Sequence, residues 1–338
     1  MNDLNSKKIN ELARDIVNRN VIIVAGTGVS LLSLDEKQKK IASWKGLLQS
    51  GMIYCEECQL VNEKQKKLIS DQIESNETIF MTCAAQQIVH FMGGRGINFK
   101  RWIKQTIAKL KISDNRLIKK ILKLNCPIIT TNYDDLIEQV CGMKYYTANN
   151  DKEFIIEQIR NYRNAIPNNY DPHIIHLHGH YNHLDSLVFD ISSYEDITRN
   201  QQVQELLRSI DTTLTYLFIG CGVAGLTDPN FGPLLHRSNE LFSNINSKHY
   251  RLVKNEELLN EHDTNNRMIM LEYGEKYDDI IPFMDILLEQ VEEVRKYQKS
   301  INDQLEIEKY HATMEASQEE KEELELLEKL MRKYNRTS

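Results

Sequence analysis

The sequence is poor in the features of secreted and membrane proteins. Its 338 residues include only 6 cysteines, which are scattered along the chain. Scattered cysteines fit free thiols in a reducing compartment better than a disulfide framework. No apolar run is long enough to span a bilayer, and the polar first residues precede no apolar signal region. We therefore expect a cytoplasmic protein without a membrane-spanning segment.

Basic charge is also in deficit. The chain has 42 Lys and Arg against 49 Asp and Glu, a net charge of −7. An acidic chain has no general attraction to nucleic acid or anionic lipid, so we expect neither membrane association nor direct nucleic-acid binding. With 41% hydrophobic and 27% charged residues, the composition is that of a folded globular protein. The length suits one large domain with an appendage.

Metal-binding patterns are incomplete. Cys55 and Cys58 form a single C-x-x-C without a second pair, whereas a structural zinc normally has four ligands. His176, His178 and His180 alternate, so on a strand they would share one face and could bind a metal. No cluster of carboxylates or thiols accompanies them in the sequence. We therefore expect no bound metal, with a histidine site as the alternative.

The chain is organised around a short β-branched run that ends in a glycine turn. Residues 21–24 read as a strand buried on both faces in a parallel sheet. The turn that follows contains Gly26, Thr27, Gly28 and Ser30. Glycine lets the backbone approach a ligand, and a helix starting near Ser30 would add an anion site beside the turn. The alternative is a plain tight turn between a core strand and the next element.

Further strand-like runs follow, separated by helical stretches. They comprise residues 127–131, 174–178, 187–189, 215–219, 250–253 and 268–271. Strands alternating with helices imply parallel pairing, so we predict an α/β fold with a Rossmann-like, doubly wound parallel sheet. Residues 31–40 read as a loop. Residues 45–125 are mostly helical and predict an insertion between the first two strands, with an interhelix loop at residues 93–96.

The C-terminal part has a different character. No glycine follows Gly274 and no proline follows Pro282, while apolar residues recur mostly at intervals of three and four. We therefore predict a folded body at 1–285 and an amphipathic tail at 286–338, formed by one long helix or a helix pair. The apolar stripe of the tail is narrow. It either packs on its own domain or pairs with another chain, and we expect a homo-oligomer.

Four polar or glycine-rich segments directly follow strand-like runs. They are residues 26–30, 131–134, 178–179 and 220–228. In an open parallel sheet, the ligand crevice lies beyond the carboxyl ends of the strands. We therefore expect these four segments to converge on one crevice, although they are far apart in the sequence.

These segments resemble the motifs of the sirtuin family. Gly26-Thr27-Gly28-Val29-Ser30 resembles its G-A-G-x-S phosphate loop, and Thr131-Asn132-Tyr133-Asp134 resembles a shortened form of its T-Q-N-x-D segment. His178-Gly179 is similar to the family's His-Gly. Gly220-Cys221-Gly222 stands where the family has a late Gly-Thr-Ser turn, and Asn255 is similar to its late adenosine-contacting Asn. The resemblance spans roughly residues 15–275 and excludes the tail.

The departures from the family point to one branch of it. Sirtuin deacylases carry two C-x-x-C pairs for zinc after the His-Gly, and none follows His178. The Asp-Phe-Arg loop of the deacylases is replaced here by residues 43–48. Residues 132–135 and 228–230 are more similar to the bacterial sirtuin-like NADase domains of antiphage defence. Those domains are often paired with a sensor or with a HerA-type ATPase, so the resemblance implies a HerA-like ATPase as a partner.

The resemblance implies an NAD⁺ hydrolase that releases nicotinamide and ADP-ribose, with NAD as its substrate and no metal. It implies catalytic roles for Asn132 and His178. The NAD-binding residues that it implies are Gly26, Thr27, Gly28, Ser30, Asp134, Gly220, Gly222, Asp228 and Asn255. The alternatives are an NAD-dependent protein deacylase and a non-catalytic regulatory subunit that binds NAD or ADP-ribose.

The residue types suit this chemistry. Asn132 can orient a ribose hydroxyl or a water through its amide, and the imidazole of His178 can accept a proton. Ser30 would add a hydroxyl to a pyrophosphate clamp. Asp134 either bonds the ribose and its loop or caps a helix. The alternative for His178 is a hydrogen-bonded core histidine, and Cys221 reads as a small buried residue.

Overall fold

The computed structural model describes residues 3–164, 173–222, 249–256 and 268–334. In this part of the chain, seven parallel strands form one sheet in the order β3-β4-β2-β1-β5-β6-β7. The strands are β1 (Val21–Ala25), β2 (Ile128–Thr130), β3 (Tyr145–Thr147), β4 (Ile174–His176), β5 (Thr215–Ile219), β6 (His249–Lys254) and β7 (Met268–Gly274). The predicted α/β fold with a doubly wound parallel sheet is confirmed.

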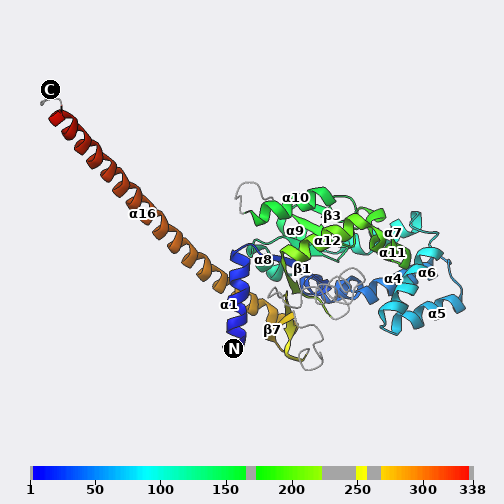
Figure 1. The fold of residues 1–338 in the computed structure, drawn as a ribbon. Coiled ribbons are helices and arrows are strands. Elements are labelled where there is room, and N and C mark those ends of the chain that lie inside the picture. Colours follow the sequence, from blue (N-terminus) through cyan, green and yellow to red (C-terminus); the bar gives the residue numbers. More distant parts are fainter. Residues whose placement is uncertain (1–2, 165–172, 223–248, 257–267, 335–338) are drawn as a thin grey trace.

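Helices cover both faces of the sheet (Figure 1). They are α1 (Asp3–Val17), α2 (Thr27–Ser33), α3 (Glu36–Ala42), α4 (Trp44–Glu57), α5 (Glu63–Glu74), α6 (Thr78–Phe91), α7 (Ile97–Gln105), α8 (Arg116–Lys123), α9 (Leu136–Cys141), α10 (Lys152–Arg163), α11 (Ile191–Arg199), α12 (Gln201–Thr213) and α16 (Ile280–Tyr334). Helices α2 to α8 all lie between β1 and β2 in the sequence, where the sequence predicts helical structure.

The central strand divides the core into two layers. All five residues of β1 are buried, as the uninterrupted β-branched run predicts. Ile23 packs into a cluster with α1, α4 to α9 and the start of α16, whereas Ile22 and Val24 pack into a second cluster with α10, α11 and α12. Successive residues of a strand point to opposite faces, so one short run anchors both layers.

The strand register brings four strand ends to one edge of the sheet. Ala25 of β1 pairs with Thr130 of β2 and with Ile219 of β5, and Thr130 pairs with His176 of β4. The segments that follow these four residues therefore all start at the same edge. This arrangement is the one expected for a ligand crevice in an open parallel sheet.

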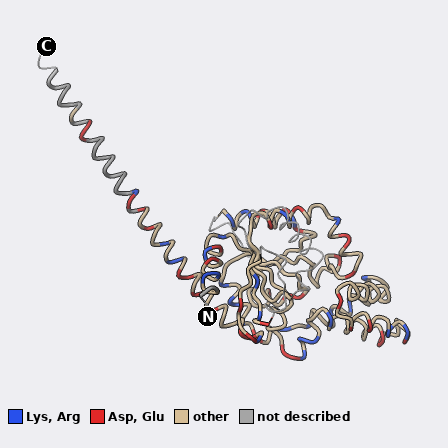
Figure 2. Tube along the Cα trace, turned by 60° about the horizontal axis from the view of Figure 1, so that its bottom comes forward, with Lys and Arg blue, Asp and Glu red and all other residues tan. Residues whose placement is uncertain are grey.

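Helix α16 is a single helix of 55 residues and not a helix pair. Its first turns are part of the core, since Phe283, Met284, Leu287 and Val291 are buried. Figure 1 shows α16 passing α1 and then leaving the body, and Tyr297 is already 68% exposed. At about 1.5 Å per residue, the helix is roughly 80 Å long. Figure 2 shows both signs of charge interspersed over the body and the part of α16 that lies next to it.

Two local predictions are wrong, and one strand was missed. Residues 31–40 are not a loop, because α2 covers their start and Asp35 begins α3 by accepting the N–H groups of Lys37 and Gln38. Residues 187–189 are buried but form no strand among the described residues. The edge strand β3 was not predicted.

The loop prediction at residues 93–96 is confirmed, since it joins α6 to α7. Within the described ranges, none of the helices has the length and apolarity that crossing a membrane requires.

Candidate functional site

The two glycine turns lie against each other at the carboxyl edge of the sheet. The N–H of Gly28 donates to the carbonyl oxygen of Gly220 at 2.9 Å, and the N–H of Gly26 donates to that of Ile219 at 2.9 Å. A Cβ atom on Gly28 would lie 2.7 Å from the Cα atom of Gly220, which itself has φ of +66°. Backbone contact between the turns therefore requires glycine at these positions.

Helix α2 begins at Thr27, directly within the first glycine turn. The start is three residues earlier than the sequence predicts, so Ser30 lies inside the helix and is buried. Its hydroxyl donates to Asp134 Oδ2 at 2.8 Å and accepts from Asn132 Nδ2 at 2.9 Å. Ser30 thereby links the segment after β1 to the segment after β2.

Asn132 is held mainly through its nitrogen atoms. Its Nδ2 also donates to the carbonyl oxygen of Gly26 at 3.1 Å, and its backbone N–H donates to Thr130 Oγ1 at 3.1 Å. The Oδ1 atom accepts only a long bond from Thr27 Oγ1, at 3.4 Å, among the described contacts. The amide oxygen is therefore the end of the side chain with acceptor capacity to spare.

Asp134 is buried below this network. Burial raises the pKa of its carboxyl to about 6, although the hydrogen bonds from Ser30 and from the N–H of Leu136 act in the opposite direction. The bond from Leu136, at 3.2 Å, is to the first residue of α9. Asp134 thus fixes its loop and accepts the N–H of the first residue of α9, and a contact with the ribose stays a prediction.

A small cavity of about 160 Å³ lies beside these residues. Asn132, Asp134 and His178 all contribute to its walls, together with Thr27 and Tyr194. The ring of His178 is itself 4% exposed and meets the ring of Tyr194 edge-on, at a centroid distance of 5.6 Å. The two residues with implied catalytic roles therefore line one cavity.

A larger cavity of about 850 Å³ lies on the other side of Thr27, which lines both cavities. The glycines Gly28, Gly220 and Gly222 form part of its wall. Lys39 and Lys40 of α3 add positive charge, while the wall also contains acidic residues of α3 and of the segment after β7.

Among the implied NAD-binding residues that the structure describes, Gly26, Ser30 and Asn255 are absent from the linings of both cavities. Asp228 lies outside the described residues. Asn255 directly follows β6 and is exposed, and the described lining of neither cavity includes it. A role for Asn255 in adenosine binding therefore stays a prediction.

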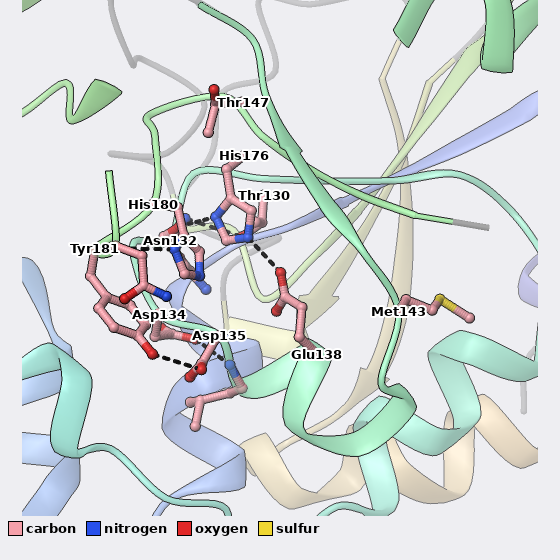
Figure 3. A network of polar contacts seen from close by, with 12 residues as sticks. Thr130, Asn132, Asp134, Asp135, Glu138, Met143, Thr147, His176, His180 and Tyr181 are labelled. Atoms are coloured by element: carbon pink, nitrogen blue, oxygen red, sulfur yellow. Dashed lines mark hydrogen bonds and ion pairs between the residues drawn. The ribbon is translucent and has the colours of Figure 1, made fainter. Parts of the chain in front are cut away.

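The three alternating histidines do not share a face. Strand β4 ends at His176, and Gly179 turns the chain with φ of +79°, so strand alternation stops before His178. His178 lines the small cavity, whereas His176 and His180 approach Glu138 of α9 (Figure 3). The ligand atoms of this trio lie within 4.8 Å of one another, the one such group among the described residues.

The sequence analysis missed Glu138. The carboxylate Oε1 lies 2.7 Å from His176 Nε2, and the side chain of Glu138 is only 10% exposed. No spacing rule connects a residue in the first turns of α9 with the end of β4.

The cysteines show no reactive environment. Cys221 packs against Gly26, and burial raises the pKa of its thiol to about 12. Burial also raises the pKa of Cys55 to about 11, and Cys58, at the end of α4, is a free thiol. A thiol with a raised pKa stays protonated and is a poor nucleophile at neutral pH.

Aromatic rings form the wall between the site and the helices of the insertion. Trp44 and Phe99 both meet the ring of Phe189 edge-on, at centroid distances of 5.1 and 5.9 Å. Arg95, in the loop between α6 and α7, donates to the carbonyl oxygen of Leu187 at 2.6 Å and pairs with Asp190 at 3.1 Å. These contacts fasten the insertion to the segment that follows His178.

Comparisons with known proteins agree with this arrangement. Residues 127–276 match the family model described as the SIR2-like domain. The chain is also 25% identical, over 260 residues, to the NAD(+) hydrolase ThsA of Bacillus cereus (strain MSX-D12). That match covers 76% of this chain and 48% of ThsA, so the chain spans about half the length of this curated relative. Over residues 127–276, which run from the start of β2 past the end of β7, the chain is therefore similar to the SIR2-like domain.

Proposed function

We propose that the protein is an NAD⁺ hydrolase that cleaves the bond between nicotinamide and ribose. The observation that carries the proposal is the pair of cavities that meet at Thr27. One is built on the glycine turns, and the other contains Asn132 and His178. A dinucleotide extended across Thr27 has its pyrophosphate beside the glycine turns and its nicotinamide ribose in the small cavity.

The reaction consumes NAD⁺ and water and gives nicotinamide, ADP-ribose and a proton. The bond between ribose C1′ and the nicotinamide nitrogen breaks, and its electron pair leaves with nicotinamide. Positive charge grows on the ribose, and water adds to C1′. The proton of that water must be accepted by a base.

Asn132 and His178 supply groups of the required kind. The amide oxygen of Asn132 accepts a hydrogen bond from a ribose hydroxyl or from the attacking water, while its Nδ2 atom is held by Gly26 and Ser30. His178 is the base that takes the proton, directly from water or through a ribose hydroxyl. The buried Asp134 holds the loop that carries Asn132 through Ser30.

On the resemblance to antiphage NADase domains, we extend the proposal to the protein's role in the cell. The matched relative is named as an NAD⁺ hydrolase, which supports the same activity here. Depletion of NAD⁺ stops the metabolism of an infected cell, so the protein acts as an effector of antiphage defence. As part of this proposal, the chain works as a homo-oligomer and pairs with a HerA-like ATPase.

The test is to incubate the full chain with NAD⁺, alone and with a candidate partner, and to separate the products by chromatography. Equal amounts of nicotinamide and ADP-ribose are expected. The variants Asn132→Ala and His178→Ala should lose roughly 100- to 10,000-fold in turnover, the usual effect of removing a general base or a positioned polar group. His90→Ala, at an exposed position in the last turn of α6 and outside the described linings of both cavities, is the matched control and should keep wild-type turnover.

The same experiment distinguishes the alternatives. Nicotinamide release that requires an acylated peptide would identify a deacylase and refute the hydrolase. Binding of NAD⁺ or ADP-ribose without turnover, in every preparation, would identify a regulatory subunit. Wild-type turnover in either variant would remove that residue from the proposed mechanism.

A further inference from the structure

The two ring nitrogens of His176 make two different contacts. Nδ1 lies 2.9 Å from the backbone carbonyl oxygen of Asn132, and Nε2 lies 2.7 Å from Glu138 Oε1 (Figure 3). A carbonyl oxygen only accepts hydrogen bonds, so Nδ1 carries a proton and donates it. His176 is fully buried, and water therefore takes no part in these contacts.

The contact between His176 and Glu138 contains a second proton. Two lone pairs facing each other at 2.7 Å would repel, so one hydrogen lies between Nε2 and Oε1. It belongs either to an imidazolium paired with a carboxylate or to a carboxylic acid that donates to the ring. In both cases the bond is short and fixes the plane of the ring.

His180 completes the cluster but does not make it a metal site. The N–H of Asn182 donates to His180 Nδ1 at 3.2 Å, so that nitrogen has a lone pair and the ring proton is on Nε2. Burial, with His176 and His183 nearby, lowers the pKa of His180 to about 3, so the ring is neutral. A metal would need the Nε2 lone pair, which would force a proton onto Nδ1 against the N–H of Asn182.

The described contacts leave two buried atoms of the cluster without a hydrogen-bond partner, His180 Nε2 and Glu138 Oε2. One is a donor and the other an acceptor, and they belong to the same trio. A hydrogen bond between these two atoms would join Glu138 to both rings.

We infer that Glu138 and His176 are positioning residues for Asn132. The inference rests on the proposed function. Asn132 follows β2, Glu138 is in the helix that follows Asn132, and His176 ends the neighbouring strand β4. The bonds from Glu138 to His176 and from His176 to the Asn132 carbonyl close a ring across these three elements. This ring fixes the main chain of Asn132, and hence the direction in which its amide oxygen points into the small cavity.

The test compares three substitutions. His176→Asn keeps an N–H in the place of Nδ1 and should retain most of kcat. His176→Leu removes the donor and should lower kcat by about 100-fold, with the KM for NAD⁺ close to wild type because neither positioning residue touches the substrate. Glu138→Gln can still donate to Nε2 and should retain most of kcat.

The matched control is a second buried pair at the opposite edge of the sheet. His249 Nε2 lies 3.5 Å from Asp211 Oδ1, at the amino end of β6. His249→Asn and Asp211→Asn disturb a similar pair and should lower the melting temperature without changing kcat. Equal kcat losses in the control pair and in His176→Leu would show a general effect of destabilisation and overturn the inference.

Two readouts do not depend on hydrolysis. The shared proton should give a far-downfield proton NMR resonance that disappears in Glu138→Gln and in His176→Asn. Elemental analysis of the full chain should find no stoichiometric metal that is lost in the same variants. Absence of the resonance, or presence of such a metal, overturns the inference. An inactive wild type refutes the proposed function, and the resonance still decides whether the pair shares a proton.

Discussion

The buried carboxyl of Asp134 makes a quantitative prediction about stability and pH. Its pKa is about 6 in the folded protein against an ordinary value of 3.8, mainly because burial disfavours the charged form. The folded state therefore holds the proton more tightly than the unfolded chain does between these two values. The contribution of Asp134 to the free energy of unfolding is therefore most favourable below pH 4. It falls as the pH rises toward 6 and changes little above that pH.

The magnitude follows from the two pKa values. A shift of about two units corresponds to a penalty of about 3 kcal/mol at pH 7. Of this penalty, about 1.3 kcal/mol develops between pH 5 and pH 7. Asp134→Asn removes the charge at every pH and keeps a side chain of similar size. The variant should therefore gain stability relative to wild type by about 1.3 kcal/mol between these pH values.

The assay is urea unfolding of both proteins at a series of pH values from 5 to 8. Subtracting the free energies of unfolding of the two proteins at each pH removes the contributions of the histidines and other groups that titrate in both. The stability of Asp134→Asn minus that of wild type should increase with pH and level off above pH 7. A constant difference, or one that decreases with pH, would show that the carboxyl is already ionised at pH 5 and refute the reasoning.

Three further predictions concern the turns, the metal question and the tail. Gly28→Ala should cost about 1–3 kcal/mol of unfolding free energy, because its Cβ would meet the backbone of Gly220, whereas Gly222→Ala should cost nothing measurable in urea unfolding. NAD⁺ cleavage should continue in EDTA; activity that EDTA removes and zinc or magnesium restores would make the Glu138 cluster a metal site. A chain ending at Lys299 keeps the buried start of α16 but loses the exposed Ile301 and Leu305. Light scattering should give it a lower mass than the full chain, and an unchanged mass would remove the tail from assembly.

The sequence was sufficient to predict the sheet and its crevice edge where strand patterns were strong. Residues 21–24 are all β-branched, which is typical of a strand buried on both faces, and all five residues of β1 are buried. The short edge strand β3 is only half-buried at Tyr145 and Tyr146, which weakens its pattern. Residues 187–189 have a strand composition, but the N–H of Phe189 donates to Ser193 Oγ and leads into α11.

The candidate site was predictable only in part. Asn132 and His178 each follow a strand, so the rule for parallel sheets brings them to one edge. The approach of Glu138 to His176 depends on how α9 packs under β4, which is a tertiary contact without a local signature. The earlier start of α2 had the same origin, because the hydrogen bonds of Gly26 and Gly28 go to a turn almost 200 residues away.

The first turn of α16 gives the long helix a mechanical connection to the nucleotide-sized cavity. Ile280, its first residue, lines the cavity of about 850 Å³, and Tyr277 and Asp278 directly before it do the same. The next turns are locked into the core through Met284 and Leu287. The helix is therefore anchored in the body by its first turns, and the part beyond them is several times longer than the anchored part. If another molecule tilted the far end of α16, the helix would rotate about these core residues. Ile280 would then move, and the cavity wall would move with it.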